Sequence, residues 1–189
     1  YSAEVGVLAS AGGDAVAVIG YLDQGGKGII QGSLDSGAFD TFILSDGMIG
    51  DSLTDAFGKS LNKSFGSLPG STGKGAGIFT KVAKAAGIDS SGPYTGESYD
   101  AAALIVLAMQ AGGSADRGSI AKNVMAVANG PGKKIYPGQL KKALNLLAKG
   151  KGVDYEGATA VNFTDVGEAV GSFLEKEVKG GKFKTKKQR

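Results

Sequence analysis

The sequence contains neither cysteine nor histidine. Without cysteine the chain can form no disulfide, no zinc–thiolate site and no thiol nucleophile. Without histidine it lacks the general base of Ser-His-Asp and Cys-His arrangements and the commonest ligand of transition metals. Most nucleophilic hydrolases and most transition-metal enzymes are therefore excluded. The chain also has few aromatic residues, six tyrosines and eight phenylalanines, against 33 glycines, which indicates many tight turns.

A strong charge imbalance and a long apolar run are also lacking. The net charge is +3, and part of the excess lies in residues 182–189, which we interpret as a solvated terminus, so we predict no nucleic-acid partner. No apolar run approaches the roughly 20 residues that cross a bilayer, and we recognise no signal peptide, so we expect a soluble mature chain. The remaining composition, 42% hydrophobic and 21% charged, is typical of a globular protein.

The most informative stretch is residues 15–48. Two short apolar runs, at 15–19 and 42–44, flank a segment of helical period at 25–36. This pattern predicts a βαβ unit whose parallel strands are buried on both faces. Tyr21 follows the first run and Asp46 follows the second. Because ligands of open α/β sheets bind beyond the carboxyl ends of the strands, we predict that Tyr21 and Asp46 stand side by side at a crevice.

The rest of the chain is predominantly helical in pattern. Asp51 is a plausible N-cap for the helix that follows it, and the glycine- and serine-rich stretch 66–73 is interpreted as a crossover. Helical patterns follow at 78–86, 99–110, 116–128 and 137–148, then strand patterns at 158–163 and 172–178, with a turn at Gly180 and Gly181. The helices between 72 and 150 have large apolar faces but almost no strand sequence to receive them. We therefore expect the chain to be the C-terminal part of a larger protein, or one piece of a nicked one.

Four segments carry a family resemblance. They are Gly-Tyr at 20–21 with Gly-Gly at 25–26, FILSDG at 42–47, GPYTGESYDAA at 92–102, and YEGAT at 155–159 with NFTDVGE at 162–168. In this order they resemble the branched-chain amino acid (leucine/isoleucine/valine) type of periplasmic solute-binding protein of ABC transporters, over essentially the whole chain, as the C-terminal half of such a protein. The resemblance implies an α/β, type I periplasmic binding protein-like fold of two Rossmann-like lobes joined by hinge crossovers. Residues 1–66 would be part of the C-terminal lobe, 67–155 part of the N-terminal lobe and mostly helical, and 156–189 a return to the C-terminal lobe.

The resemblance also implies a ligand site. In the family a tyrosine and an acidic residue contact the α-ammonium of a bound amino acid, and the matching positions are Tyr21 and Asp46. Cation–π and charge-assisted hydrogen bonds of this kind each contribute on the order of 1 to 3 kcal/mol when water is excluded. The family often has glutamate where Asp46 stands, so the shorter side chain leaves room for another ligand or a bridging water. Tyr94 matches an aromatic position that touches the ligand's side chain. The family's α-carboxylate site would lie in the missing N-terminal part.

The function implied is that of a non-enzymatic binding protein without a cofactor, periplasmic or extracellular and lipid-anchored, which delivers an amino acid to the membrane permease of an ABC transporter. Two alternatives keep the fold: an amide, urea-like or small carboxylic ligand, or a ligand-sensing regulatory domain. An enzyme is disfavoured because no close carboxylate pair or activated lysine is recognisable.

The site residues also have purely structural interpretations. Asp46 could close a turn through Gly47 or cap the next helix, and Tyr21 and Tyr94 could only pack. Glu97 and Asp100 are interpreted as first-turn residues that favour a helix N-terminus, with a ligand contact by Glu97 as the alternative.

Overall fold

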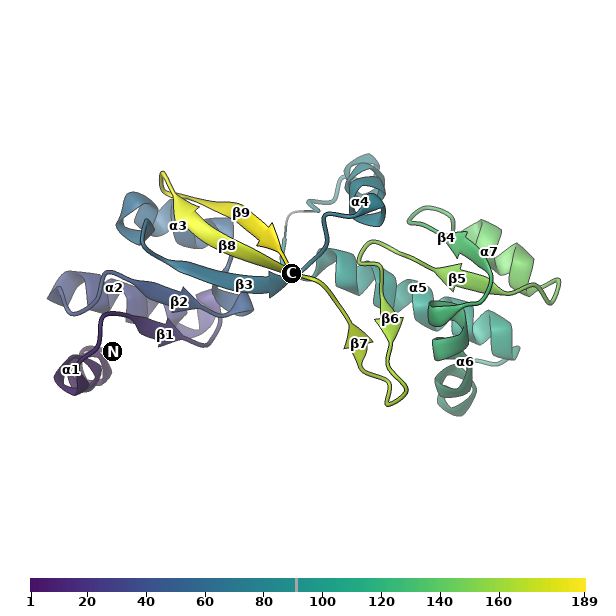
Figure 1. Ribbon diagram of the computed structural model, residues 1–189, viewed down its shortest axis with the longest axis horizontal. Coiled ribbons are helices and arrows are strands. Elements are labelled where there is room, and N and C mark those ends of the chain that lie inside the picture. The colour runs from purple at the N-terminus through teal and green to yellow at the C-terminus, as the bar shows by residue number, and fades with distance from the viewer. Residues whose placement is uncertain (91) are drawn as a thin grey trace. The chain divides into compact units, whose positions relative to one another are not determined.

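The computed structural model describes residues 1–90 and 92–189. The chain divides into two compact units, which Figure 1 shows coloured along the sequence. The first unit is Tyr1–Pro69 together with Phe173–Arg189, and the second is Gly70–Ser172.

The first unit is built on a five-stranded mixed sheet (Figure 1). The strands in spatial order are β1 (Val16–Val18), β2 (Phe42–Leu44), β3 (Phe65–Pro69), β8 (Phe173–Lys179) and β9 (Lys182–Gln188). β1 and β3 each pair in parallel with β2, whereas β8 is antiparallel to both β3 and β9. The helices are α1 (Ser2–Ala11), α2 (Lys27–Ser36) and α3 (Asp51–Phe57), with short helical turns η1 (Leu22–Gly26), η2 (Asp46–Met48) and η3 (Gly58–Leu61). The βαβ unit predicted at 15–48 is confirmed as β1–α2–β2.

The prediction that these strands are buried on both faces is wrong, because only one face is buried. Phe42 and Leu44 are buried in one core with Ile30 of α2 and Leu53 of α3, whereas Ile43 between them is 42% exposed. The physical reason is the topology. The crossovers β1–α2–β2 and β2–α3–β3 advance in the same direction across the sheet, and right-handed crossovers then place both helices on one face.

Two segments with a different sequence interpretation are strands. The expected crossover at 66–73 begins inside β3, where Gly66 is required because a Cβ there would lie 2.2 Å from the carbonyl oxygen of Leu44. The tail 182–189, interpreted as solvated, is β9, in which only Phe183 packs against the core. Its lysines protect the edge of the sheet from further pairing. The predicted turn at Gly180 and Gly181 is confirmed, with φ of 64° and 77°.

The second unit is mainly helical (Figure 1). Its helices confirm the four predicted patterns: α4 (Lys74–Ala85), α5 (Thr95–Gly112), α6 (Arg117–Asn129) and α7 (Leu140–Leu147). Its strands are β4 (Lys133–Ile135) parallel to β5 (Val153–Tyr155), and β6 (Asn162–Phe163) antiparallel to β7 (Ala169–Val170). The sequence interpretation missed β4 and β5, which are three residues each. Their inward residues Ile135, Val153 and Tyr155 join the core of α5, α6 and α7.

The unit boundaries lie at Pro69/Gly70 and Ser172/Phe173, later in the chain than the expected changes of lobe after residues 66 and 155. Residues that follow β5 stay with the second unit because hydrogen bonds hold them there. Asn129 of α6 donates to the carbonyl of Phe163 at 2.7 Å and accepts from its N–H at 2.8 Å. Asp100 of α5 binds the segment that starts at Ala158. Which unit corresponds to which lobe stays a prediction. The expected N-cap Asp51 is instead the first residue of α3, after Gly50.

One-sided burial of β2 can be tested with neighbouring residues. Phe42→Ala should lower the free energy of unfolding by about 3–5 kcal/mol, because it removes a fully buried ring. Ile43→Ala, on the opposite face of the same strand, should cost less because that side chain is partly in water. Urea unfolding followed by circular dichroism measures both, and equal losses would contradict the one-sided core.

Candidate functional site

Two neighbouring strand ends form the candidate site in the first unit. β1 and β2 are parallel and in register, so Tyr21 and Asp46 leave the sheet at the same edge. Ser45 links the two ends: its N–H donates to the carbonyl of Val18 at 3.2 Å, and its hydroxyl both accepts from the Gly20 N–H at 3.2 Å and donates to the Gly20 carbonyl at 3.3 Å. Ser45 was not predicted from the sequence, although a hydroxyl residue directly after an apolar strand was the available signal.

The ring of Tyr21 packs against the turn that begins with Asp46. A Cβ on Gly47 would lie 2.7 Å from Cδ1 of Tyr21 and 2.5 Å from the carbonyl oxygen of Gly20, so this close approach requires glycine. The Tyr21 side chain is nevertheless 58% exposed, and its hydroxyl makes no hydrogen bond to any residue that the structure describes. The ring therefore packs on one side and remains accessible on another.

Asp46 is half-buried at the start of η2. Its Oδ1 accepts a hydrogen bond from the Gly47 N–H at 2.8 Å, so the turn-closing interpretation of this residue is confirmed. Within residues 1–90 and 92–189 its carboxylate has no other hydrogen-bond or ion-pair partner. A carboxylate can accept several hydrogen bonds, so closing the turn leaves Asp46 able to bind a cationic or hydrogen-bonding group.

Tyr94 lies in the second unit, directly before α5. Its backbone is in the left-handed region, with φ 61° and ψ 10°, and its carbonyl accepts from the Ser98 N–H at 2.8 Å. A tyrosine in this region is uncommon, and such strained residues concentrate at functional sites. The structure thus brings Tyr21 and Asp46 together in one unit and places Tyr94 at a helix start in the other.

Asp100 has a role that its sequence position did not suggest. It is 2% exposed, and its carboxylate accepts from the Tyr155 hydroxyl, the Ala158 N–H and the Thr159 N–H at 2.8 Å each, and from the Thr159 hydroxyl at 2.7 Å. It therefore ties α5 to the end of β5 and the following loop, and its interpretation as a first-turn residue favouring the helix N-terminus is wrong. Gly157, with φ 55°, lies against the carboxylate, where a Cβ would approach Oδ1 to 2.3 Å.

Burial perturbs two groups near Asp100. Burial, and then the negative charge of Asp100, raise the pKa of Tyr155 far above its usual value, so this phenol stays protonated as a hydrogen-bond donor. The pKa of half-buried Glu97 is also raised, first by burial and to a smaller extent by Asp100. In the parts of the chain that the structure describes, no cluster of three or more acidic side chains could hold a metal ion.

The fold has known counterparts. No protein-family model matches the sequence. A leucine binding protein, LivK, from Thermotoga maritima matches with a TM-score of 0.69 and 20% identity, over 99% of this chain and 47% of that one. A periplasmic binding protein type 1 from Bordetella pertussis matches with a TM-score of 0.65 and 20% identity, over 100% of this chain and 48% of that one. The chain has the type 1 periplasmic binding fold.

A protein with a related sequence is also named as a substrate-binding protein. The chemotactic signal transduction system substrate-binding protein BasB of Halobacterium salinarum is 36% identical over 83 residues, which are 43% of this chain and 20% of that protein. The chain spans about half the length of the solved structures with the type 1 periplasmic binding fold that it matches, and the 83 matched residues cover a fifth of this curated relative. No helix in the described residues is long and apolar enough to cross a membrane.

The Asp100 cluster should be a major source of stability in the second unit. Asp100→Ala leaves several buried donors without an acceptor, and we expect it to lower the free energy of unfolding by about 3–5 kcal/mol. Tyr155→Phe removes a single hydrogen bond and should cost about 1 kcal/mol. Denaturant unfolding measures both, and comparable small effects from the two variants would show that the carboxylate is not the shared acceptor.

Glu97 should make stability depend on pH. Because the pKa of Glu97 is raised, the folded chain keeps this carboxyl protonated to a higher pH than the unfolded chain does. The contribution of the protonated carboxyl to the free energy of unfolding is therefore fully present below pH 4.5, the ordinary pKa of the group, and is lost as the pH rises through the pKa of the folded state. Glu97→Gln should therefore melt at a higher temperature than wild type near about pH 7, with the difference shrinking towards about pH 4. Glu4→Gln, which removes an exposed charge, is the matched control. A difference between Glu97→Gln and wild type that is constant with pH would contradict this assignment.

Proposed function

We propose that this chain is the C-terminal half of an extracytoplasmic solute-binding protein, which captures a free amino acid between two lobes and delivers it to the permease of an ABC transporter. The observation that carries the proposal is the pairing of the Tyr21 ring with the turn of Asp46 at adjacent strand ends. The carboxylate of Asp46 is engaged by one backbone N–H alone among the described residues. An accessible aromatic ring beside a carboxylate that can accept further hydrogen bonds suits a primary ammonium group.

The chemistry favours a ligand that is cationic at this point. An ammonium group over the Tyr21 ring gains a cation–π interaction, and a hydrogen bond to Asp46 is charge-assisted. In the proposed pocket Tyr94 contacts the ligand's side chain and so contributes to the choice between amino acids. The ligand's carboxylate would be bound by the missing N-terminal part of the protein.

The comparisons support a binding protein rather than an enzyme. Two solved structures with this fold, from Thermotoga maritima and Bordetella pertussis, are named as binding proteins, and the first as a leucine binding protein. The proposed mechanism is closure: the bound amino acid stabilises the closed arrangement because it contacts both lobes only there.

A second candidate function keeps the ligand site and changes the recipient. The relative from Halobacterium salinarum is named as part of a chemotactic signal transduction system. The ligand-loaded protein would then present itself to a membrane receptor instead of a permease. A ligand of the amide, urea-like or small carboxylic class remains the alternative for the pocket, and Asp46 argues against an anionic group at this position.

The proposed ligand site is tested by calorimetric titration of the full-length protein with the free amino acids. Wild type should bind at least one of them, and Asp46→Asn should weaken that binding by about 1.5–3 kcal/mol, since the charge-assisted hydrogen bond becomes a neutral one. Tyr21→Phe keeps the ring and should be close to wild type, whereas Tyr21→Ala should lose affinity.

Matched variants separate the site from the fold. Asp23→Asn removes the same charge from an exposed residue two positions after Tyr21 and should leave affinity unchanged. Tyr94→Ala should alter the ranking of amino acids more than the binding of their common ammonium group. The proposal is refuted if no amino acid binds, or if Asp46→Asn binds as tightly as wild type.

A further inference from the structure

The second unit has a one-sided distribution of charge. No aspartate or glutamate lies between Asp116 and Asp154 in the sequence. Within that interval Lys134 alone has an ion-pair partner among the described residues; it contacts Asp154 and Glu156. The basic residues of the interval are Arg117, Lys122, Lys133, Lys134, Lys141, Lys142, Lys149 and Lys151.

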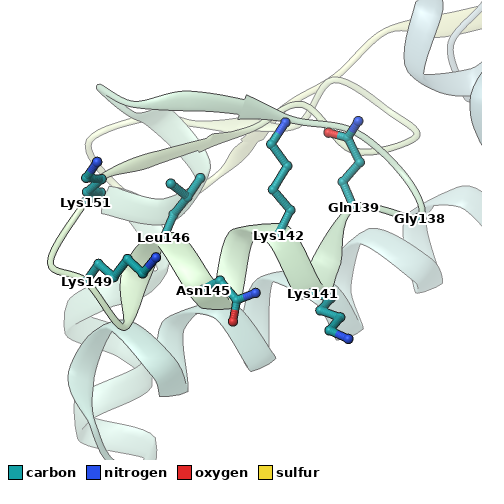
Figure 2. A pocket seen from close by; sticks show the side chains of 8 residues that line it. All are labelled: Gly138, Gln139, Lys141, Lys142, Asn145, Leu146, Lys149 and Lys151. Atoms are coloured by element: carbon teal, nitrogen blue, oxygen red, sulfur yellow. The ribbon is translucent and has the colours of Figure 1, made fainter.

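Four of these lysines line a hollow of about 560 Å³ along α7, which Figure 2 shows from close by. We call this the α7 surface; its polar residues are Lys141, Lys142, Lys149 and Lys151 with the amides Gln139 and Asn145. Lys142 and Gln139 extend in the same direction from the start of the helix (Figure 2). Gln139 accepts a hydrogen bond from the Tyr136 N–H through Oε1, so its amide nitrogen remains a donor.

The helix cannot turn these lysines away from the hollow. Ala143 is completely buried, and Leu140, Leu144 and Leu147 pack against the core of the second unit. The rotation of α7 about its own axis is therefore fixed by its apolar face. Lys141 and Lys142 are therefore held away from this core, and Figure 2 shows them extending in different directions from α7.

The position of two of the lysines does not favour the helix itself. Lys141 and Lys142 are the second and third residues of α7, whose first turn contains no acidic residue. The N-terminal end of a helix carries partial positive charge, so each cation there is disfavoured by about 0.3–1 kcal/mol. Lys149 and Lys151 lie beyond the other end, outside the last turn of α7, which contains no basic residue. Helix stability therefore gives no structural reason for Lys141 and Lys142.

We propose that the α7 surface binds an acidic segment of a partner protein. Charge complementarity is the main argument, because four lysines without an ion pair among the described residues gain most from carboxylates placed between them. The directions of the lysines favour one class of partner. Lys141 and Lys142 extend in different directions from α7 (Figure 2), so a flexible chain with aspartate or glutamate side chains can follow the helix and reach both, whereas a flat lipid surface would meet only part of the set. Gln139 and Asn145 add donors for carboxylate or backbone carbonyl oxygens.

This surface acts separately from the capture of an amino acid. It lies wholly in the second unit, whereas Tyr21 and Asp46 lie in the first. Failure of one proposal therefore leaves the other standing.

The test uses a fluorescein-labelled polyglutamate peptide and the full-length protein, with binding followed by fluorescence polarisation. Wild type should bind, and the affinity should fall several-fold between about 50 mM and about 300 mM salt. Lys141→Glu combined with Lys142→Glu should weaken binding about tenfold or more. This variant should not melt earlier than wild type, because acidic residues in the first turn of α7 are favoured by the dipole.

The matched control is Lys59→Glu combined with Lys179→Glu, which makes the same charge change at exposed positions of the first unit. It should retain wild-type affinity within about twofold. Co-sedimentation with phosphatidylglycerol vesicles is measured in parallel. The proposal is overturned if the peptide does not bind, if the control loses as much affinity as the α7 variant, or if the vesicles bind in place of the peptide.

Discussion

The parallel pairing of β1 with β2 is the constraint on which the candidate site depends. Parallel strands in register end at one edge of the sheet, so the residues that follow them must be neighbours. Ser45 holds the two strand ends close together, because its N–H and hydroxyl form hydrogen bonds with the end of β1 and the residues after it. Gly47 then allows the Tyr21 ring to lie on the turn that Asp46 closes. A ring and a carboxylate are thus held by backbone geometry and not by a bond to each other.

A buried carboxylate has the corresponding role in the second unit. Asp100 joins a helix to the loop after β5 by four hydrogen bonds, which offset the cost of removing a charged group from water. Tyr155 donates one of them and stays protonated because it is buried beside that charge. This cluster, together with the hydrogen bonds between Asn129 and Phe163, holds the segment after β5 to α5 and α6. The α7 surface is the opposite case, since its charges lack partners among the described residues.

How far the sequence predicted the structure depended on the length of each element. The helices α4 to α7 and the unit β1–α2–β2 were predictable because their apolar residues repeat with a clear period. The strands β4 and β5 were not, because strands of three residues, KKI and VDY, are too short to show a period. β9 looked like a solvated tail because six of its seven residues are exposed lysine, threonine or glutamine, and only Phe183 contributes to the core.

The sequence by itself determined the order of the elements, the chemistry available without cysteine or histidine, and the positions of Tyr21 and Asp46 after two buried strands. These features follow from residue type and local period. Only the tertiary structure decided that one face of β1 and β2 is uncovered in this chain, that Ser45 links their ends, and that Asp100 is a buried acceptor. Each of these depends on contacts between residues far apart in the chain. Such contacts form only when distant segments meet, so they decide which face of the sheet a crossover covers, how closely a glycine packs and whether a carboxylate is buried.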